Sequence, residues 1–271
     1  METRTLVNLD VPVIGMGSAT TFNVEEESDL SIRRQIIDNC IASGSTFIDT
    51  SPMYGRAEQA LGITMEGRVN ELQLATKVWA VGKESGRRQI ARSFELLGAN
   101  HIHLFQVHNM VDWRTHLPYL ENLKEEGKID LIGITYTFPN GLPEMAEIMK
   151  TRRVDTIQVS YNVLEREVEE EILPLADELD MGVLIMRPLG SGSLAKGLQR
   201  EPDLSPLKEF GITKWPQALL AWCLGDPRID MLIPATTRPN RVFDNAAAGS
   251  FTILPQEYRD HIVSEAKRCL K

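Results

Sequence analysis

Four side chains of complementary chemistry lie at or just after predicted strands in the first half of the chain. One short apolar strand ends on Asp49, and Tyr54 stands five positions later. The next two apolar strands carry Lys77 near the end of one and His108 at the end of the other. A phenol has a reference pKa of about 10, but a nearby ammonium stabilises the phenolate and lowers that pKa. The set therefore predicts a proton donor, Tyr54, that is tuned by Lys77.

The two other members of the set have supporting roles. We expect Asp49 to pair with Lys77, because an unpaired buried ammonium is costly. We expect His108 to hydrogen-bond a substrate oxygen. Each of these residue types alone is usually a turn, surface or core-edge residue, but their occurrence at successive strand ends favours a shared site.

Strand and helix patterns alternate along the chain and must position these side chains. Short apolar runs predict strands at 11–18, 46–49, 72–78, 102–107, 131–135, 156–161, 183–186 and 231–233. Helical spacing predicts helices at 28–43 with Ser28 as N-cap, then at 57–66, 85–97, 114–126, 142–150, 165–179, 214–224 and 239–248. Eight strand-then-helix units over roughly 250 residues match a single-domain α/β fold, the (β/α)₈ TIM barrel. A further helix is expected at about 256–270.

In such a barrel the carboxyl ends of the strands form the active face, so the four residues should converge there. A doubly wound open sheet is the alternative, with Asp49 as a ribose-binding acid. The turn Gly15-Met16-Gly17-Ser18-Ala19-Thr20 lacks the third glycine of that fold's GxGxxG motif, which favours the barrel. We expect segment 1–10 to cover the opposite end of the barrel and segment 189–213 to be a functional loop.

Composition limits the classes of partner. The chain has 271 residues, 42% of them hydrophobic, and a formal net charge of −9, which disfavours nucleic-acid binding. The three cysteines are scattered, as is usual in a reducing compartment. No basic N-terminal segment precedes an apolar run, and no stretch has the length of a membrane span. We expect a cytoplasmic protein without a membrane partner, either a monomer or a small homo-oligomer.

The segment Phe47-Ile-Asp-Thr-Ser-Pro-Met-Tyr-Gly-Arg-Ala-Glu58, followed by Ala60-Leu61-Gly62, resembles the signature of the aldo-keto reductases. The segments 75–78 and 104–108 resemble the lysine and histidine strands of that family, and the likeness extends from Ile14 to Asn245. The resemblance implies NADPH-dependent reduction of an aldehyde or ketone. Tyr54 would be the general acid, with Lys77 and Asp49 tuning it and His108 orienting a small carbonyl or alcohol substrate.

Two segments are candidates for holding the cofactor. Glycines after the seventh strand let backbone N–H groups approach a pyrophosphate. The start of the eighth helix favours anions, and its two arginines would hold a 2′-phosphate. With positions carried over from the family, the expected NADP(H) contacts are Gly17, Thr135, Tyr136, Gln158, Arg187, Pro188, Leu189, Gly190, Ser191, Gly192, Leu194, Thr236, Thr237, Arg238, Arg241 and Asn245.

The chain departs from the family pattern at three places. Thr135-Tyr136 stands where Ser-Asn is frequent. Met186 or Arg187 replaces the aromatic residue that usually stacks on the nicotinamide. Ala235 stands where many members carry a lysine, and Arg238 is expected to compensate for it.

Other residues are assigned by position. Phe22, Met53, Trp79, Asn109 and Trp113 lie near the expected catalytic face and are candidate substrate walls. His101 and His103 have the HxH spacing of metal sites, but they fall at the start of the fourth strand, on the opposite face, so we assign no metal site. Few residues follow Asn245 beyond the terminal helix, so we expect a pocket that is open or is finished by the loops after strands one, two and four.

Two other classes of protein are alternatives to a reductase. The first is an NADP(H)-binding regulatory or redox-sensing subunit with little or no turnover, against which the complete catalytic set counts. The second is a metal-dependent barrel hydrolase, which is disfavoured because no His/Asp cluster appears across strand ends one, four, five, six and eight.

Overall fold

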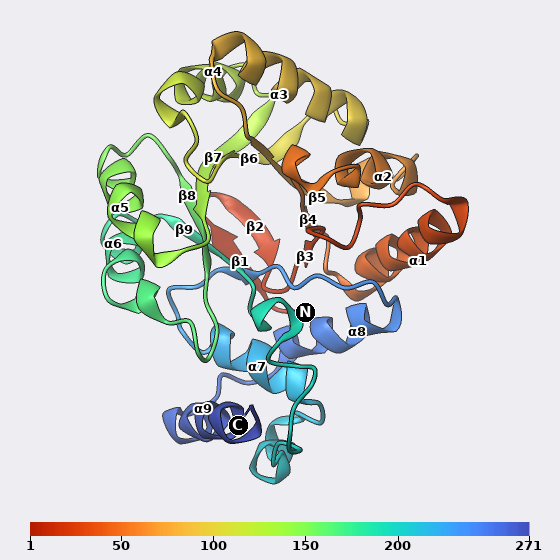
Figure 1. Ribbon diagram of the computed structural model, residues 1–271, viewed down its shortest axis with the longest axis vertical. Helices are drawn as coiled ribbons and strands as arrows, with labels where there is room; N and C mark the ends of the chain where they lie inside the picture. The colour runs from red at the N-terminus through yellow and green to blue at the C-terminus, as the bar shows by residue number, and fades with distance from the viewer. Residues whose placement is uncertain (271) are drawn as a thin grey trace.

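The computed structural model describes residues 1–270, and its larger sheet is a parallel barrel (Figure 1). Eight strands pair in the order of the chain, each parallel to the next. A parallel bridge between Ile14 and Leu232 joins the first strand to the last. The strands are β3 (Met16–Gly17), β4 (Phe47–Asp49), β5 (Gln73–Val78), β6 (Ile102–His108), β7 (Ile129–Tyr136), β8 (Thr156–Ser160), β9 (Gly182–Met186) and β10 (Met231–Leu232). The prediction of a (β/α)₈ barrel is confirmed.

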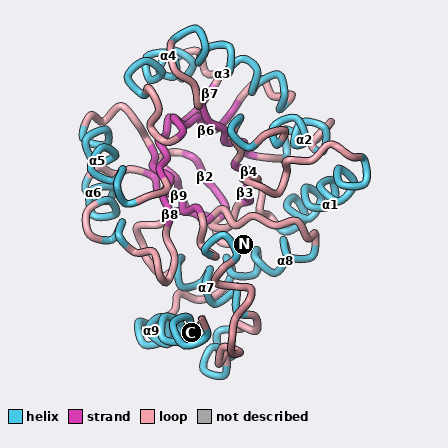
Figure 2. The backbone as a smooth tube through the Cα atoms, viewed as in Figure 1, coloured by secondary structure: helices cyan, strands magenta, loops and turns pink. Residues whose placement is uncertain are grey.

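Helices form a ring outside these strands, as Figure 2 shows. They are α1 (Glu27–Ser43), α2 (Ala57–Thr64), α3 (Lys83–Leu97), α4 (Trp113–Glu125), α5 (Leu142–Lys150), α6 (Ile172–Glu178), α7 (Trp215–Leu224) and α8 (Asn240–Ala247). The terminal helix α9 (Gln256–Cys269) packs against α7 outside the ring. Within residues 1–270, no helix combines the length and hydropathy that crossing a membrane would require.

Most predicted elements lie within a few residues of their predicted bounds, and three differ in a way that has a structural reason. The expected strand at 11–18 is divided, because Val11 belongs to β2 (Leu9–Pro12), which forms an antiparallel hairpin with β1 (Thr3–Leu6). Helix α1 begins after Glu26, whose backbone is extended, so Ser28 as the N-cap is wrong. The helix expected at 165–179 is confined to α6, since Pro174 has no N–H to bond the preceding turn.

The hairpin covers the N-terminal end of the barrel, as expected for segment 1–10. Figure 1 shows β1 and β2 across the barrel opening. Leu6 and Val11 belong to one apolar cluster with inward-facing residues of the strands, which are Phe47, Ala75, Leu104, Leu131, Leu184, Met231 and Ile233. This layer closes one end of the barrel, so the opposite end is the open one.

Replacing Leu6 with alanine is expected to lower the free energy of unfolding by about 2–5 kcal/mol, because Leu6 is fully buried and its loss leaves a cavity. Urea unfolding measures this change. Val81→Ala is the control, since Val81 is 76% exposed and its truncation should cost about 0.5 kcal/mol or less. Equal losses in the two variants would show that the hairpin does not close the core.

Candidate active site

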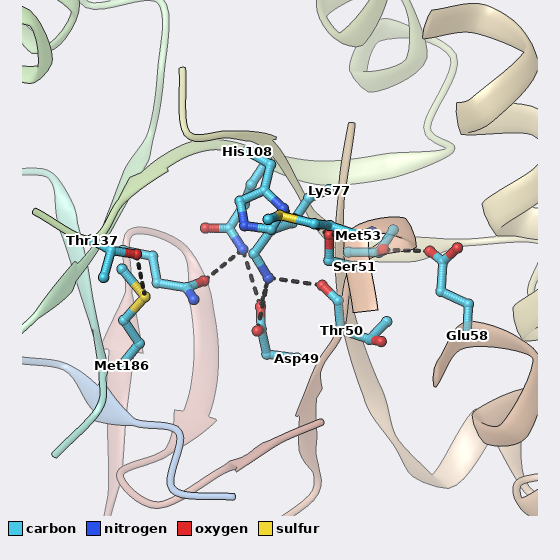
Figure 3. Close-up of polar contacts among 12 residues, drawn as sticks. Asp49, Thr50, Ser51, Met53, Glu58, Lys77, His108, Thr137 and Met186 are labelled. Atoms are coloured by element: carbon cyan, nitrogen blue, oxygen red, sulfur yellow. Dashed lines mark hydrogen bonds and ion pairs between the residues drawn. The ribbon is translucent and has the colours of Figure 1, made fainter. Parts of the chain in front are cut away.

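Asp49 and Lys77 form a buried ion pair between neighbouring strands (Figure 3). The Lys77 ammonium donates to both carboxylate oxygens of Asp49, at 2.7 and 2.8 Å, and to the carbonyl of Thr50 at 2.7 Å. An ammonium has three N–H donors, so all of them are used. The Lys77 side chain is 0% exposed and the Asp49 side chain is 2% exposed. The pair is thus a fixed charged unit inside the barrel.

Gln106 extends this unit across the barrel. Its side-chain amide donates to Asp49 at 3.2 Å and to the Gln158 side-chain oxygen at 2.8 Å. Burial raises the pKa of the Asp49 carboxyl, while Lys77, Gln158 and Gln106 oppose that shift. Sequence analysis missed Gln106, although its inward position two residues before His108 on the same strand was an available signal.

Tyr54 lies above the ion pair, in the 3₁₀ helix η1 (Pro52–Tyr54) that follows β4. The Lys77 ammonium lies 5.4 Å from the centroid of the Tyr54 ring. Burial raises the pKa of Tyr54, Lys77 lowers it, and the balance lies above the ordinary value of 10.0. The expectation that Lys77 makes this phenol more acidic than usual is therefore wrong for the protein alone, because burial outweighs the ammonium. The phenol is fully protonated near neutral pH.

His108 ends β6 beside Tyr54, and the two rings are 5.7 Å apart in an edge-to-face arrangement. Its Nδ1 atom lies 2.7 Å from the Ser51 hydroxyl. Burial, aided by the charge of Lys77, lowers the pKa of His108 to about 3. The imidazole is therefore neutral under physiological conditions. The structure thus brings all four predicted catalytic residues to one place.

A second buried carboxylate, that of Glu58, contacts the strand that carries Lys77. The Thr76 hydroxyl donates to Glu58 at 2.6 Å, which ties α2 to β5 next to Lys77. Burial raises the pKa of Glu58. Glu58 belongs to the signature-like segment, and in the structure it holds the strand rather than facing the site.

The residues expected near the nicotinamide lie on neighbouring strands. Thr135 and Gln158 are buried on β7 and β8 and pair in register. Tyr136 ends β7 and is partly exposed. Gly17 ends β3, where an added Cβ would come within 2.7 Å of the Ile233 carbonyl. This contact requires glycine at that position.

The loop after β9, which contains the glycines expected to approach the cofactor, has an unusual backbone. Gly190, Ser191 and Gly192 all have positive φ angles. Arg187 also has a positive φ, its guanidinium donates to Glu165 at 2.9 Å, and its buried Nε atom has no hydrogen-bond partner within residues 1–270. Of the remaining residues expected in this loop, Leu194 is buried, and Pro188 and Leu189 join the strand to the turn.

The second expected cofactor segment precedes and enters α8. Thr236 is buried, and its hydroxyl accepts from the backbone N–H of Arg238 at 3.1 Å. Thr237 and Arg238 are exposed, and Arg241 is partly exposed in the first turn of the helix. Asn245 is buried one turn further on. Both segments follow the carboxyl ends of strands, on the same face as Tyr54.

The candidate substrate walls divide into an exposed group, which includes Met53 and Trp79, and a buried group of Phe22 and Trp113. Met53 and Trp79 are 44% and 43% exposed beside the site, and Asn109 follows His108 with a positive φ. Phe22 has no exposed surface and packs under the guanidinium of Arg33, so its assignment as a pocket wall is wrong in this conformation. Trp113 is 8% exposed, with its indole N–H donated to Glu144. Phe138, which sequence analysis missed, is exposed after β7.

His101 and His103 lie near Asp130 at the far end of the barrel, with potential ligand atoms within 4.8 Å of one another. His103 Nδ1 accepts the backbone N–H of Leu74 at 3.1 Å. In the neutral ring the proton is therefore on Nε2. A protonated ring nitrogen has no lone pair to offer a metal ion, so Nε2 is not a metal ligand in this form. We assign no metal site to this cluster.

The fold and these side chains define the class of protein. An eight-stranded parallel barrel with ionisable groups gathered at the carboxyl ends of its strands is a TIM-barrel enzyme. Residues 13–263 match the model of the aldo/keto reductase family. The chain belongs to this family, as its resemblance at the catalytic strands predicted.

Individual relatives are distant but cover most of the chain. The methylglyoxal reductase YeaE of Escherichia coli is 26% identical over 245 residues, which are 88% of this chain and 86% of that protein. A holo aldo-keto reductase of Bacillus halodurans is 25% identical with a TM-score of 0.82, covering 97% of this chain and 96% of that one. An enzyme of Klebsiella pneumoniae, solved with NADP and acetate, has the same identity and TM-score over 96% of this chain and 93% of its own.

Proposed function

We propose that this protein reduces an aldehyde or ketone to an alcohol by hydride transfer from NADPH, with Tyr54 as the general acid. The observation that carries the proposal is the position of the Tyr54 ring within 5.4 Å of the Lys77 ammonium and 5.7 Å of the neutral His108 ring. Family membership and the NADP complex of the Klebsiella relative support it.

Tyr54 would transfer its proton as hydride reaches the carbonyl carbon. Negative charge then develops on the carbonyl oxygen, which becomes a far stronger base than a phenolate, so the transfer is favourable despite the raised pKa of Tyr54. The phenolate left behind lies next to Lys77, whose charge stabilises it. Asp49 and the Thr50 carbonyl hold that ammonium in place throughout.

NADPH, when bound, supplies the hydride. The residues expected to hold it fit its chemistry, because the turn 190–192 after β9 has positive φ at each residue and carries two glycines, which let a main chain approach a pyrophosphate closely, and the start of α8 offers Arg238 and Arg241 to a phosphate. Gln158 is expected to bind the carboxamide through its amide, since its side-chain oxygen already accepts from Gln106.

The proposal is tested by mixing purified protein with NADPH and a panel of aldehydes and ketones, including the methylglyoxal of the relative's name. Loss of the reduced-nicotinamide absorbance, with the matching alcohol as product, is the expected result. Tight NADPH binding without turnover on any carbonyl, together with a stable protein partner in pull-down, would instead favour the regulatory subunit.

Replacing Arg241 with alanine is expected to raise KM for NADPH by roughly 10- to 100-fold with little change in kcat, because a charge-assisted hydrogen bond to the 2′-phosphate is lost. KM for NADH, which lacks that phosphate, should not change. The control is Arg92→Ala, since Arg92 pairs with Glu95 on the surface of α3, away from the site. An equal rise for both cofactors would contradict the assignment of Arg241.

A further inference from the structure

The buried hydroxyl of Ser51 contacts two groups of the site at once. Its oxygen lies 2.7 Å from His108 Nδ1 and accepts the backbone N–H of Met53 at 3.1 Å (Figure 3). Ser51 has no exposed surface. It caps the 3₁₀ helix that carries Tyr54, so the same side chain touches both the phenol's helix and the imidazole.

The hydrogen bonds of Ser51 decide which nitrogen of His108 carries the proton. A hydroxyl has one proton to donate, and among residues 1–270 His108 Nδ1 is the only acceptor in contact with it. If Nδ1 carried a proton, the hydroxyl proton would be buried without a partner, which is unfavourable. If the hydroxyl donates to Nδ1, every contact is satisfied and the ring proton is on Nε2.

We propose that Ser51 is a positioning residue that fixes His108 as the Nε2–H tautomer. The inference rests on the proposed reduction and deepens it. In this tautomer His108 donates a second hydrogen bond to the carbonyl oxygen, beside Tyr54. In the other tautomer the ring would present a lone pair, which repels that oxygen and competes for the Tyr54 proton.

The tautomer matters because the ring has no charge. Burial and Lys77 hold the pKa of His108 at about 3, so lowering the pH to 5 does not supply the missing proton. Within residues 1–270 the groups around the ring are Lys77, Tyr54 and Ser51, and of these Ser51 is the one that bonds to Nδ1. His108 keeps its proton during the reaction, since Tyr54 is the group that transfers one.

The direct test is ¹⁵N NMR of histidine-labelled protein, with the His108 signals assigned by their loss in His108→Ala. The expected pattern is an unprotonated Nδ1 and a protonated Nε2, shifting toward a tautomer mixture in Ser51→Ala. A protonated Nδ1 in the unmodified protein would overturn the proposal. This readout needs no turnover, so it is distinguishable from a failure of the proposed reductase activity.

Kinetics separate this role from capping alone. Ser51→Ala is expected to lower kcat/KM for the carbonyl roughly tenfold, which is the scale of one buried hydrogen bond. In a His108→Ala background the same substitution should have little further effect, because its partner is absent. An equal loss in both backgrounds would mean that Ser51 acts only by capping the turn of Tyr54, and would contradict the proposal.

Discussion

Replacing Tyr54 with phenylalanine is expected to lower kcat for carbonyl reduction by about 10²–10⁴-fold, which is the usual contribution of a positioned general acid. The substitution removes only the hydroxyl. The ring keeps its edge-to-face contact with His108 and its position over Lys77. Affinity for NADPH should therefore be unchanged. Steady-state kinetics and a fluorescence titration with NADPH measure the two quantities.

The pH profile of the unmodified enzyme reports the same group. Reduction needs a protonated phenol, and burial places the pKa of Tyr54 above 10.0. We therefore expect kcat/KM to be level through neutral pH and to fall only above pH 10.0. Tyr119→Phe is the control, since Tyr119 lies on α4 beneath Arg87, outside the site. Turnover in Tyr54→Phe equal to that of the control would end the proposed role of Tyr54.

Replacing Lys77 with methionine is expected to have the second large effect, on stability as well as activity. The change leaves the Asp49 carboxylate buried without its counter-charge, and breaking such a pair from one side costs about 3–5 kcal/mol. Urea unfolding measures the loss. Lys124→Met is the matched control, because its partner Asp155 is half-buried and such a pair contributes about 1 kcal/mol or less.

The double variant Asp49→Asn with Lys77→Met isolates the interaction. Removing both charges leaves no unpaired ion, so its loss of stability should be well below the sum of the two single losses. Additive losses would show that the two side chains do not depend on each other. Activity should stay low in the double variant, because the positive charge that stabilises the phenolate is absent.

The sequence was sufficient to predict the barrel and the centre of its site. Alternation of apolar strands with helices determines a parallel barrel, and side chains at the ends of parallel strands meet at one face. Asp49, Lys77 and His108 were therefore predictable from position alone. Tyr54 required only that the loop after β4 turn inward, which Ser51 and Pro52 bring about by starting a 3₁₀ helix.

What the sequence did not predict depends on register and depth of packing. Gln106 meets the ion pair because it pairs with Lys77 in neighbouring strands, and strand register is not encoded locally. Phe22 follows the first strand like a pocket residue, yet contact with Arg33 places it in the core. The pKa of Tyr54 depends on a balance between burial and one charge, and residue spacing gives only the charge.

The most direct test of the account follows a labelled hydride. NADPH deuterated at nicotinamide C4 is incubated with the protein and an aldehyde, and the product alcohol is analysed by mass spectrometry. We predict deuterium on the former carbonyl carbon, at a rate that falls by about 10²–10⁴-fold in Tyr54→Phe. An alcohol without deuterium, or an equal rate of transfer in the variant, would contradict a reductase in which Tyr54 supplies the proton.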